Sequence, residues 1–219
     1  MKGTDVKFTI ELTAVAFFGI AIVSGCASNE YRSVESGVIA IGKMRVTLGP
    51  GWQTAPVTET PEKLSSSKTL SRDGLEHDRL ILIAGIDEGQ TIFRDETIRG
   101  LPKFRTEMTV PEIADLIAAS LQAALWEGGA LVEATNPRAH GFVGVPGFKI
   151  ELEADIPGAA NQRGMAGGFI HEERLYVNIF LAETPEYYER HKQVAQEVID
   201  SAVPTIKTIR MSAAGPIGR

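Results

Sequence analysis

Residues 148–156 read Phe-Lys-Ile-Glu-Leu-Glu-Ala-Asp-Ile, and this stretch decides the fold class. Apolar and charged side chains alternate along it, which predicts a β-strand with one face on a core and the other in water. Pro157-Gly158 follows and predicts a loop, because both residues interrupt a strand. The charged members of the alternation are Lys149, Glu151, Glu153 and Asp155.

The sequence after this strand predicts a hairpin and then a helix. Residues 164–171 and 175–182 are two apolar runs separated by Glu172-Glu173-Arg174, which is the pattern of two antiparallel strands joined by a tight turn. A helix is expected to start at Thr184, with Pro185 in its first position, and to end before Pro204. We interpret His191 as a residue at the surface or boundary of this helix. The side chains expected to face inward are Tyr188, His191, Ala195, Val198, Ile199 and Ala202.

The sequence before the strand predicts another helix, which begins at Thr109. Thr109 and Glu112 have the spacing of a capping box, and Met108 and Ile113 have the spacing of a hydrophobic staple. Gly128-Gly129 is expected to end the helix. We expect Asp115 and Gln122 on its exposed side. Its apolar stripe consists of Ile113, Leu116, Ile117, Leu121, Ala124 and Leu125.

Further strands are expected on the N-terminal side. Residues 80–84 are apolar without alternation, which predicts a strand covered on both faces. Residues 44–48 alternate, and Gly49-Pro50-Gly51 then predicts a turn after which Trp52 packs back on the core. Weaker candidates are short strands at 68–72, 91–93 and 131–135, a turn at Asp73-Gly74, a turn at 144–147, and a mobile surface loop at 54–68.

These elements predict an α+β fold, in which a mostly antiparallel sheet is covered by two main helices, one on each face. The turn from Gly42 to Trp52, of the form G-x-x-x-x-x-x-G-P-G-W, together with a capped helix after a long irregular stretch, resembles the PsbP-like α/β/α sandwich. The resemblance spans about residues 38–208, which we expect to form a single domain. It implies a non-catalytic binding or assembly protein, by analogy of fold.

Composition limits the classes of function. The chain has 219 residues, is 43% hydrophobic and carries a net charge of −6, so it is long enough to bury a core and is not basic. An acidic chain is a poor match for phosphate backbones, and we expect no nucleic-acid partner. With one cysteine the chain has no intramolecular disulfide and no CxxC metal or redox site.

The N-terminus has the pattern of a signal peptide. Lys2 and Lys7 precede an apolar run over residues 12–23, which as a helix would span roughly 18 Å. A bilayer core is about 30 Å thick, so the run is too short for a comfortable transmembrane helix and fits the apolar region of a signal peptide.

Val23-Ser24-Gly25-Cys26 follows the apolar run and resembles the lipobox of bacterial lipoproteins, with valine where leucine is more usual. The resemblance implies that Cys26 becomes lipidated with diacylglycerol, and palmitate is the expected label. It also implies cleavage before the cysteine and acylation of the new amino group. Ala27, in place of aspartate, implies the outer membrane, facing the periplasm. We therefore expect a signal peptide over 1–25, the lipidated cysteine and a tether over 26–37, and a flexible tail over 209–219.

No catalytic, metal or cofactor signature is visible in the sequence. It holds no G-x-S-x-G, H-E-x-x-H, P-loop or G-x-G-x-x-G motif. The serines at 65–67 lack the flanking glycines of a nucleophile turn. None of the four histidines, His77, His140, His171 and His191, has another histidine within four residues. We accordingly expect no catalytic residue, no metal and no cofactor.

Three groups of side chains leave alternatives open. His171 and Glu173 could share a divalent ion, or they belong to a charged hairpin turn. Glu151, Glu153 and Asp155 could supply a carboxylate pair, or they form a solvated strand face neutralised by Arg163 or Arg45. Asp73-Gly74 and Asp87-Glu88-Gly89 could bind calcium, or they are turns, since neither has the spacing of a calcium loop.

The sequence thus favours a membrane-anchored envelope lipoprotein that binds a protein partner or assists assembly and does not catalyse a reaction. The alternative is an envelope hydrolase or small-ligand-binding lipoprotein whose site uses Asp73, Glu76, His77 and Asp78. A pocket that holds several titratable groups would favour the alternative, and a shallow, exposed surface would favour partner binding.

Overall fold

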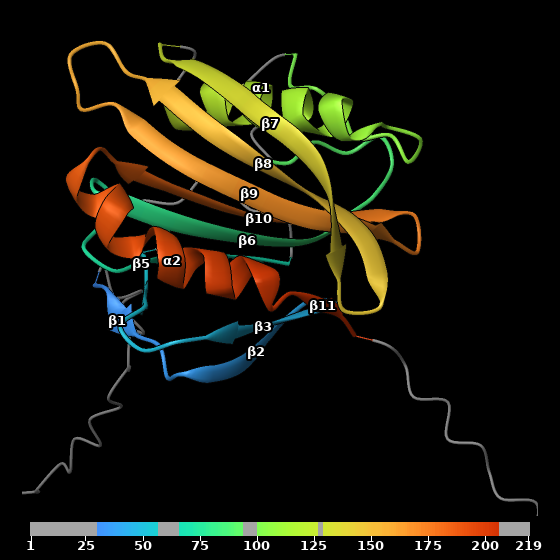
Figure 1. Ribbon diagram of the computed structural model, residues 1–219, viewed down its shortest axis with the longest axis horizontal. Helices are drawn as coiled ribbons and strands as arrows, with labels where there is room; N and C mark the ends of the chain where they lie inside the picture. Colours follow the sequence, from blue (N-terminus) through green and yellow to red (C-terminus); the bar gives the residue numbers. More distant parts are fainter. Residues whose placement is uncertain (1–29, 57–65, 94–99, 127–128, 206–219) are drawn as a thin grey trace, which may run out of the picture.

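The structure is a computed structural model that describes residues 30–56, 66–93, 100–126 and 129–205. Its centre is an eight-stranded antiparallel sheet with the strand order β1-β4-β5-β6-β10-β9-β8-β7 (Figure 1). The strands are β1 (Arg32–Ser33), β4 (Gln53–Thr54), β5 (Ser67–Ser71), β6 (Asp78–Ile86), β7 (Leu131–Phe142), β8 (Val145–Asp155), β9 (Gln162–His171) and β10 (Arg174–Glu183).

The two long helices cover opposite faces of this sheet, as Figure 1 shows with α1 on one side and α2 on the other. The helices are α1 (Val110–Trp126) and α2 (Glu186–Asp200). In β6, Ile81 and Ile83 belong to the core under α1, whereas Leu80 and Leu82 belong to the core under α2. This confirms the prediction that residues 80–84 form a strand covered on both faces, and it confirms the α+β class with one helix on each face.

A second, three-stranded sheet lies beyond α2 and was not predicted (Figure 1). It consists of β2 (Gly37–Ile41), β3 (Met44–Leu48) and β11 (Val203–Pro204), with β3 in the middle. Met44, Val46 and Leu48 face the core under α2, as their alternation predicts. Trp52 follows the turn and is fully buried, which confirms that it packs back on the core.

The start of α1 forms as its sequence indicates. The Glu112 carboxylate accepts hydrogen bonds from the backbone N–H and the hydroxyl of Thr109, at 2.7 and 2.8 Å. Met108 packs against the same core cluster as Ile113, as expected for a hydrophobic staple. Gln122 differs from the prediction, because it is half-buried and its side-chain oxygen accepts a hydrogen bond from the backbone N–H of Val132 at 3.3 Å. The helix thereby covers part of the free edge of β7.

Helix α2 approaches the sheet closely over a small residue of β9. A Cβ atom added at Gly167 would lie 2.6 Å from Cγ2 of Ile199, which is too close for a real contact. The helix begins at Glu186, with Pro185 as its N-cap, and ends at Asp200, before Pro204 as predicted. The inward face is confirmed, with Tyr188 packed against the core and Ala195, Val198, Ile199 and Ala202 buried in it.

Several predicted boundaries need correction. The strand expected at 131–135 continues through a bulge after Thr135 to Phe142, so the β7–β8 hairpin is much longer than predicted. Its turn lies at Val143-Gly144, so of the turn expected at 144–147 only Gly144 lies in the turn, and residues 145–147 belong to β8. Residues 91–93 form no strand, and Ile92 and Phe93 are buried as part of an irregular segment.

Some predicted features lie outside the described residues. They are the signal peptide and Cys26, the tail over 209–219, and most of the loop expected at 54–68. Within the described part of the chain, neither helix is sufficiently long and apolar to cross a membrane.

Candidate functional site

The four residues of the alternative site lie in the connection between β5 and β6. Asp78 is buried at the start of β6, and its carboxylate accepts hydrogen bonds from the hydroxyl of Ser71 at 2.8 Å and the backbone N–H of Asp73 at 2.8 Å. The backbone N–H of Arg72 donates to the same carboxylate at 3.0 Å. Asp78 therefore holds the turn in shape, and its acceptor sites are occupied by the turn itself.

His77 is half-buried just before β6 and contacts the end of the neighbouring strand β10 and the first turn of α2. Its Nδ1 is 3.0 Å from the Glu183 carboxylate, and its ring stacks on that of Tyr187 with centroids 4.3 Å apart. The hydrogen bond to Glu183 raises the pKa of His77 above its ordinary value. A charged His77 at this position is thus stabilised by a carboxylate on β10.

Asp73 makes the second link to α2. Its carboxylate lies 2.5 Å from Nε2 of His191 and 3.3 Å from the Arg190 guanidinium. The hydrogen bond from His191, followed by the nearby positive charges, lowers the pKa of Asp73. His191 itself is only 6% exposed, so the interpretation of His191 as a surface or boundary residue is wrong. The reason is that the β5–β6 turn folds over the helix at this point.

The structure thus brings Asp73, His77 and Asp78 to one end of the molecule without joining them into one site. Each makes a different interaction: Asp78 with its own turn, His77 with Glu183, and Asp73 with His191. Glu76 is exposed beside them. Among the described residues, no three histidine, cysteine or acidic side chains are placed to hold a metal ion.

The other candidate ligands are turn residues. Glu172 and Glu173 form the two-residue turn between β9 and β10, and Glu172 pairs with Lys43 at 2.7 Å. His171 lies 4.0 Å from the Glu172 carboxylate, at the limit of an ion pair. Asp87 pairs with Arg174 at 2.6 Å in the turn that ends at Gly89. These contacts favour the charged-turn alternatives over the metal and calcium alternatives.

A different surface is open to a ligand, on the α2 side of strands β7, β8 and β9. Because Val132 and Ala154 face the core under α1, their neighbours Leu131, Glu133 and Glu153 must face the other way. Helix α2 packs against β6, β9 and β10, and at its last residue Asp200 pairs with Lys149 and His140 of the β7–β8 hairpin. Toward the start of β7 and the end of β8, these outer strands expose their side chains on the α2 side. We call this area the open face, made of Leu131, Glu133, Glu153, Asp155 and Arg163.

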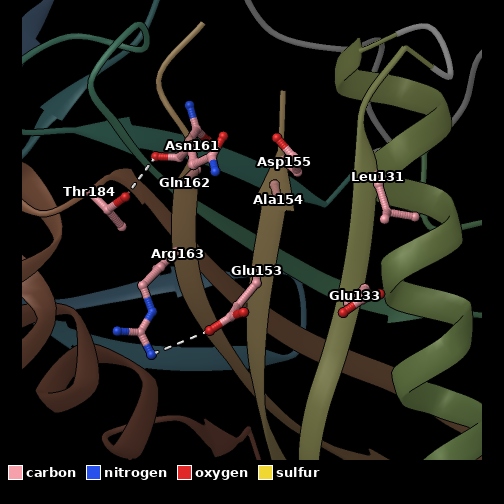
Figure 2. A pocket seen from close by; sticks show the side chains of 9 residues that line it. All are labelled: Leu131, Glu133, Glu153, Ala154, Asp155, Asn161, Gln162, Arg163 and Thr184. Atoms are coloured by element: carbon pink, nitrogen blue, oxygen red, sulfur yellow. Dashed lines mark hydrogen bonds and ion pairs between the residues drawn. The ribbon is translucent and has the colours of Figure 1, made fainter. Parts of the chain in front are cut away.

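The open face is hollowed by a pocket of about 480 Å³ at the end where β7 starts and β8 ends. Figure 2 shows its lining, with Leu131 and Glu133 on β7, Glu153 and Asp155 on β8, and Arg163 on β9. Asn161 and Thr184 close one side, where the Thr184 hydroxyl donates to the Asn161 carbonyl at 3.1 Å. The pocket is wide and shallow, which suits a protein surface better than a small, enclosed ligand.

Charge on the open face is only partly balanced. Arg163 lies 3.5 Å from the Glu153 carboxylate, which confirms Arg163 as a neutralising partner and leaves no such role for Arg45. Two residues along β8, the Glu151 carboxylate pairs with the Arg138 guanidinium at 3.4 Å. It also accepts a hydrogen bond from the side-chain amide of Asn136 at 2.9 Å. Across the part of the chain that the structure describes, no hydrogen bond or ion pair reaches the carboxylates of Glu133 and Asp155.

Part of this face was visible in the sequence and part was not. The alternation of residues 148–156 indicates that Glu151, Glu153 and Asp155 share a face. Glu133 and Leu131 were missed, although Leu-Val-Glu-Ala-Thr shows the same alternation. What the sequence lacks is the register, in which Glu133 lies opposite Glu153 and Leu131 opposite Asp155. Glu183 was also missed as the partner of His77, because the two are 106 positions apart.

Comparison with known proteins defines the class of fold. No family model and no curated protein matches the chain. Among solved structures, the chain is similar to cyanobacterial PsbP (CyanoP) from Synechocystis sp. PCC 6803, with 14% identity, a TM-score of 0.52, and coverage of 85% of this chain and 98% of that chain. The Saccharomyces cerevisiae Ran-binding protein Mog1p matches with 10% identity, a TM-score of 0.47, and coverage of 81% and 97%.

The likeness to CyanoP confirms the PsbP-like fold expected from the Gly42–Trp52 turn and the order of elements. At this level of identity it carries no information about activity or partners.

Proposed function

We propose that this protein is a lipid-anchored lipoprotein of the bacterial cell envelope. In this proposal the folded domain binds a protein partner and does not catalyse a reaction. One observation carries the proposal above the others. The one cysteine of the chain, Cys26, directly follows two small residues at the end of an apolar run of signal-peptide length. Ala27 after it favours the outer membrane, with the domain in the periplasm.

The physics of anchoring supports this arrangement. Each buried methylene group contributes about 0.8 kcal/mol to membrane binding, and stable anchoring takes about two acyl chains. A cysteine that carries diacylglycerol and an acylated amino group exceeds that requirement. The tether over 26–37 reaches at most about 40 Å when extended, so the domain would stay close to the membrane.

The binding part of the proposal rests on how the polar side chains are used. The histidines and carboxylates of the β5–β6 connection are tied into separate pairs that hold turns and helix α2. The open face, in contrast, presents two carboxylates without a partner among the described residues, next to an exposed leucine, in a shallow pocket. This combination favours contact with another protein over turnover of a small substrate.

Metabolic labelling with a palmitate analogue tests the anchor. The wild-type chain should be labelled and should float with membranes, whereas Cys26→Ser should be unlabelled and released. A matched control is the double variant Cys26→Ser/Ala27→Cys, which keeps one thiol but shifts it out of the lipobox spacing, and it should behave like Cys26→Ser. Equal labelling of the wild type and either variant would overturn the proposal.

A further inference from the structure

The carboxylates of the open face are spaced for an extended partner. Glu153 and Asp155 are two residues apart on β8, and Glu133 lies directly opposite Glu153 on β7. Side chains two residues apart on a strand are about 7 Å apart. An extended peptide repeats its own side chains with the same spacing, so alternate residues of such a peptide match this row of acids.

The pairing of Glu133 with Glu153 is unfavourable without a ligand. Like charges directly opposite each other on neighbouring strands destabilise a sheet. Arg163, on the neighbouring strand β9, forms an ion pair with Glu153 and so neutralises only one of the two carboxylates. Glu133 and Asp155 are exposed and have no hydrogen-bond or ion-pair partner among the described residues. A cationic group placed between β7 and β8 on this face would contact the carboxylates of both Glu133 and Glu153.

The open face also offers apolar area beside the acids. Leu131 is 57% exposed and lies opposite Asp155. Lysine and arginine combine a charged end with an aliphatic stem that packs on apolar surface. The pocket of about 480 Å³ between these residues is large enough for one or two such side chains.

We propose that the open face is the docking surface for an extended, lysine- or arginine-bearing segment of the partner protein. This inference rests on the proposed function and assigns its binding surface. In the bound state, cationic side chains lie between Glu133, Glu153 and Asp155, while their stems pack on Leu131. The unbalanced negative charge of the face selects a basic segment and disfavours a second copy of this acidic chain.

The test uses the full-length chain in neutral detergent and a fluorescent heptapeptide of alternating lysine and serine, with fluorescence anisotropy as the measurement. The variant Glu133→Gln/Asp155→Asn should weaken binding of this peptide by about threefold to tenfold, the effect of losing two exposed ion pairs. The matched control Glu35→Gln/Glu173→Gln removes the same charge from exposed positions elsewhere. It should change the affinity by less than about twofold.

A heptapeptide of alternating glutamate and serine serves as the charge-reversed control and should not bind. Equal loss of affinity in both double variants would show that the lysine peptide responds to net charge alone, and this would overturn the proposal. No loss in Glu133→Gln/Asp155→Asn would overturn it as well. Thermal unfolding of each variant checks that the fold is retained, as expected for exposed positions.

One competing occupant is the chain's own C-terminal segment, which carries Lys207, Arg210 and Arg219. A variant that ends at Thr205 separates the two cases. If the partner is another protein, truncation leaves the affinity for the lysine peptide unchanged. If truncation increases the affinity severalfold, the face is filled by the chain's own segment and the proposal is wrong. Neither result bears on lipidation of Cys26, so failure of this inference and failure of the anchor are distinguishable.

Discussion

The two faces of strand β8 differ in both burial and charge. On the α1 side, Ile150, Leu152 and Ala154 are buried in one continuous core. On the other side, Glu153 and Asp155 are exposed beside a shallow pocket. The same strand therefore completes a core with one set of side chains and presents charge with the other.

The difference shows where this fold has freedom to change. The face under α1 is fixed by packing, because each buried side chain touches several others and leaves no space for another shape. In the part of the chain that the structure describes, no helix packs on the open face, so the residues of this face are constrained by strand register and by charge. Binding specificity is accordingly expected on the open face, and stability on the closed one.

Breaking the closed face should have the largest effect. Leu116 is 2% exposed and Leu121 is fully buried in the core under α1. Leu116→Asp or Leu121→Asp should abolish cooperative folding, because an unpaired carboxylate in an apolar core costs more than a typical domain can lose. Circular dichroism and urea unfolding of each variant measure this. A folded Leu121→Asp protein would show that α1 does not close this face.

Two substitutions outside the buried stripe of the same helix serve as controls. Asp115 is exposed, and Asp115→Ala should cost less than about 0.5 kcal/mol. Gln122→Ala should cost about 0.5–1.5 kcal/mol, because it removes the hydrogen bond to the backbone of Val132 at the edge of β7. Equal costs at both positions would contradict the edge-covering role of Gln122.

Most of the fold was predictable because its signals are local. Alternation at 44–48 and 148–156, the unbroken run at 80–84, and the capping residues of α1 each report which face of an element is buried. The three-stranded sheet was not predictable, because β11 consists of two residues, and these pair with residues of β3 that are 158 and 160 positions away. Pairing at such distance leaves no periodic pattern in the sequence.

The candidate site was predictable only in part, for the same reason. The sequence indicates that Asp73 and His77 lie in one turn, but it does not indicate their partners. Asp73 contacts His191 of α2. His77 contacts Glu183 at the end of β10. Glu153 and Arg163 were expected to meet, since the strands that carry them are close along the chain. Glu133 depended on the length and register of β7, which the bulge after Thr135 conceals.

The link between the β5–β6 turn and α2 should respond to pH, with an intermediate effect. Because the Glu183 carboxylate raises the pKa of His77, the protonated pair stabilises the folded state at pH values below the ordinary pKa of about 6.5. This contribution is lost as pH rises through the raised pKa. His77→Gln should therefore reduce the free energy of unfolding by about 0.2–1 kcal/mol at low pH and by less at high pH.

Urea unfolding of the wild type, His77→Gln, Glu183→Gln and the double variant across this range isolates the pair as a double-mutant cycle. Asp73 supplies the opposite trend, since its lowered pKa gives stability that is present above its ordinary pKa and is lost as pH falls through the lowered value. A pH-independent coupling between His77 and Glu183 would contradict the first assignment.

The smallest expected change in the free energy of unfolding comes from a substitution on the open face. The sign of that change distinguishes the two faces of β8. Glu133 is exposed, has no partner among the described residues and lies directly opposite Glu153. Glu133→Gln removes a repulsion without removing a contact, so it should raise the free energy of unfolding by up to about 0.5 kcal/mol. Thermal and urea unfolding at low ionic strength measure the gain, and added salt should reduce it.

The matched variant Glu153→Gln removes the same repulsion together with the ion pair to Arg163, so its stability should stay near that of the wild type. A gain in stability for Glu133→Gln, combined with weaker binding of the lysine peptide by the double variant that contains it, would mean that the open face holds a charge that folding disfavours and binding uses. A loss of stability for Glu133→Gln would mean instead that this carboxylate supports the fold, and the open face would then differ from the closed face only in exposure.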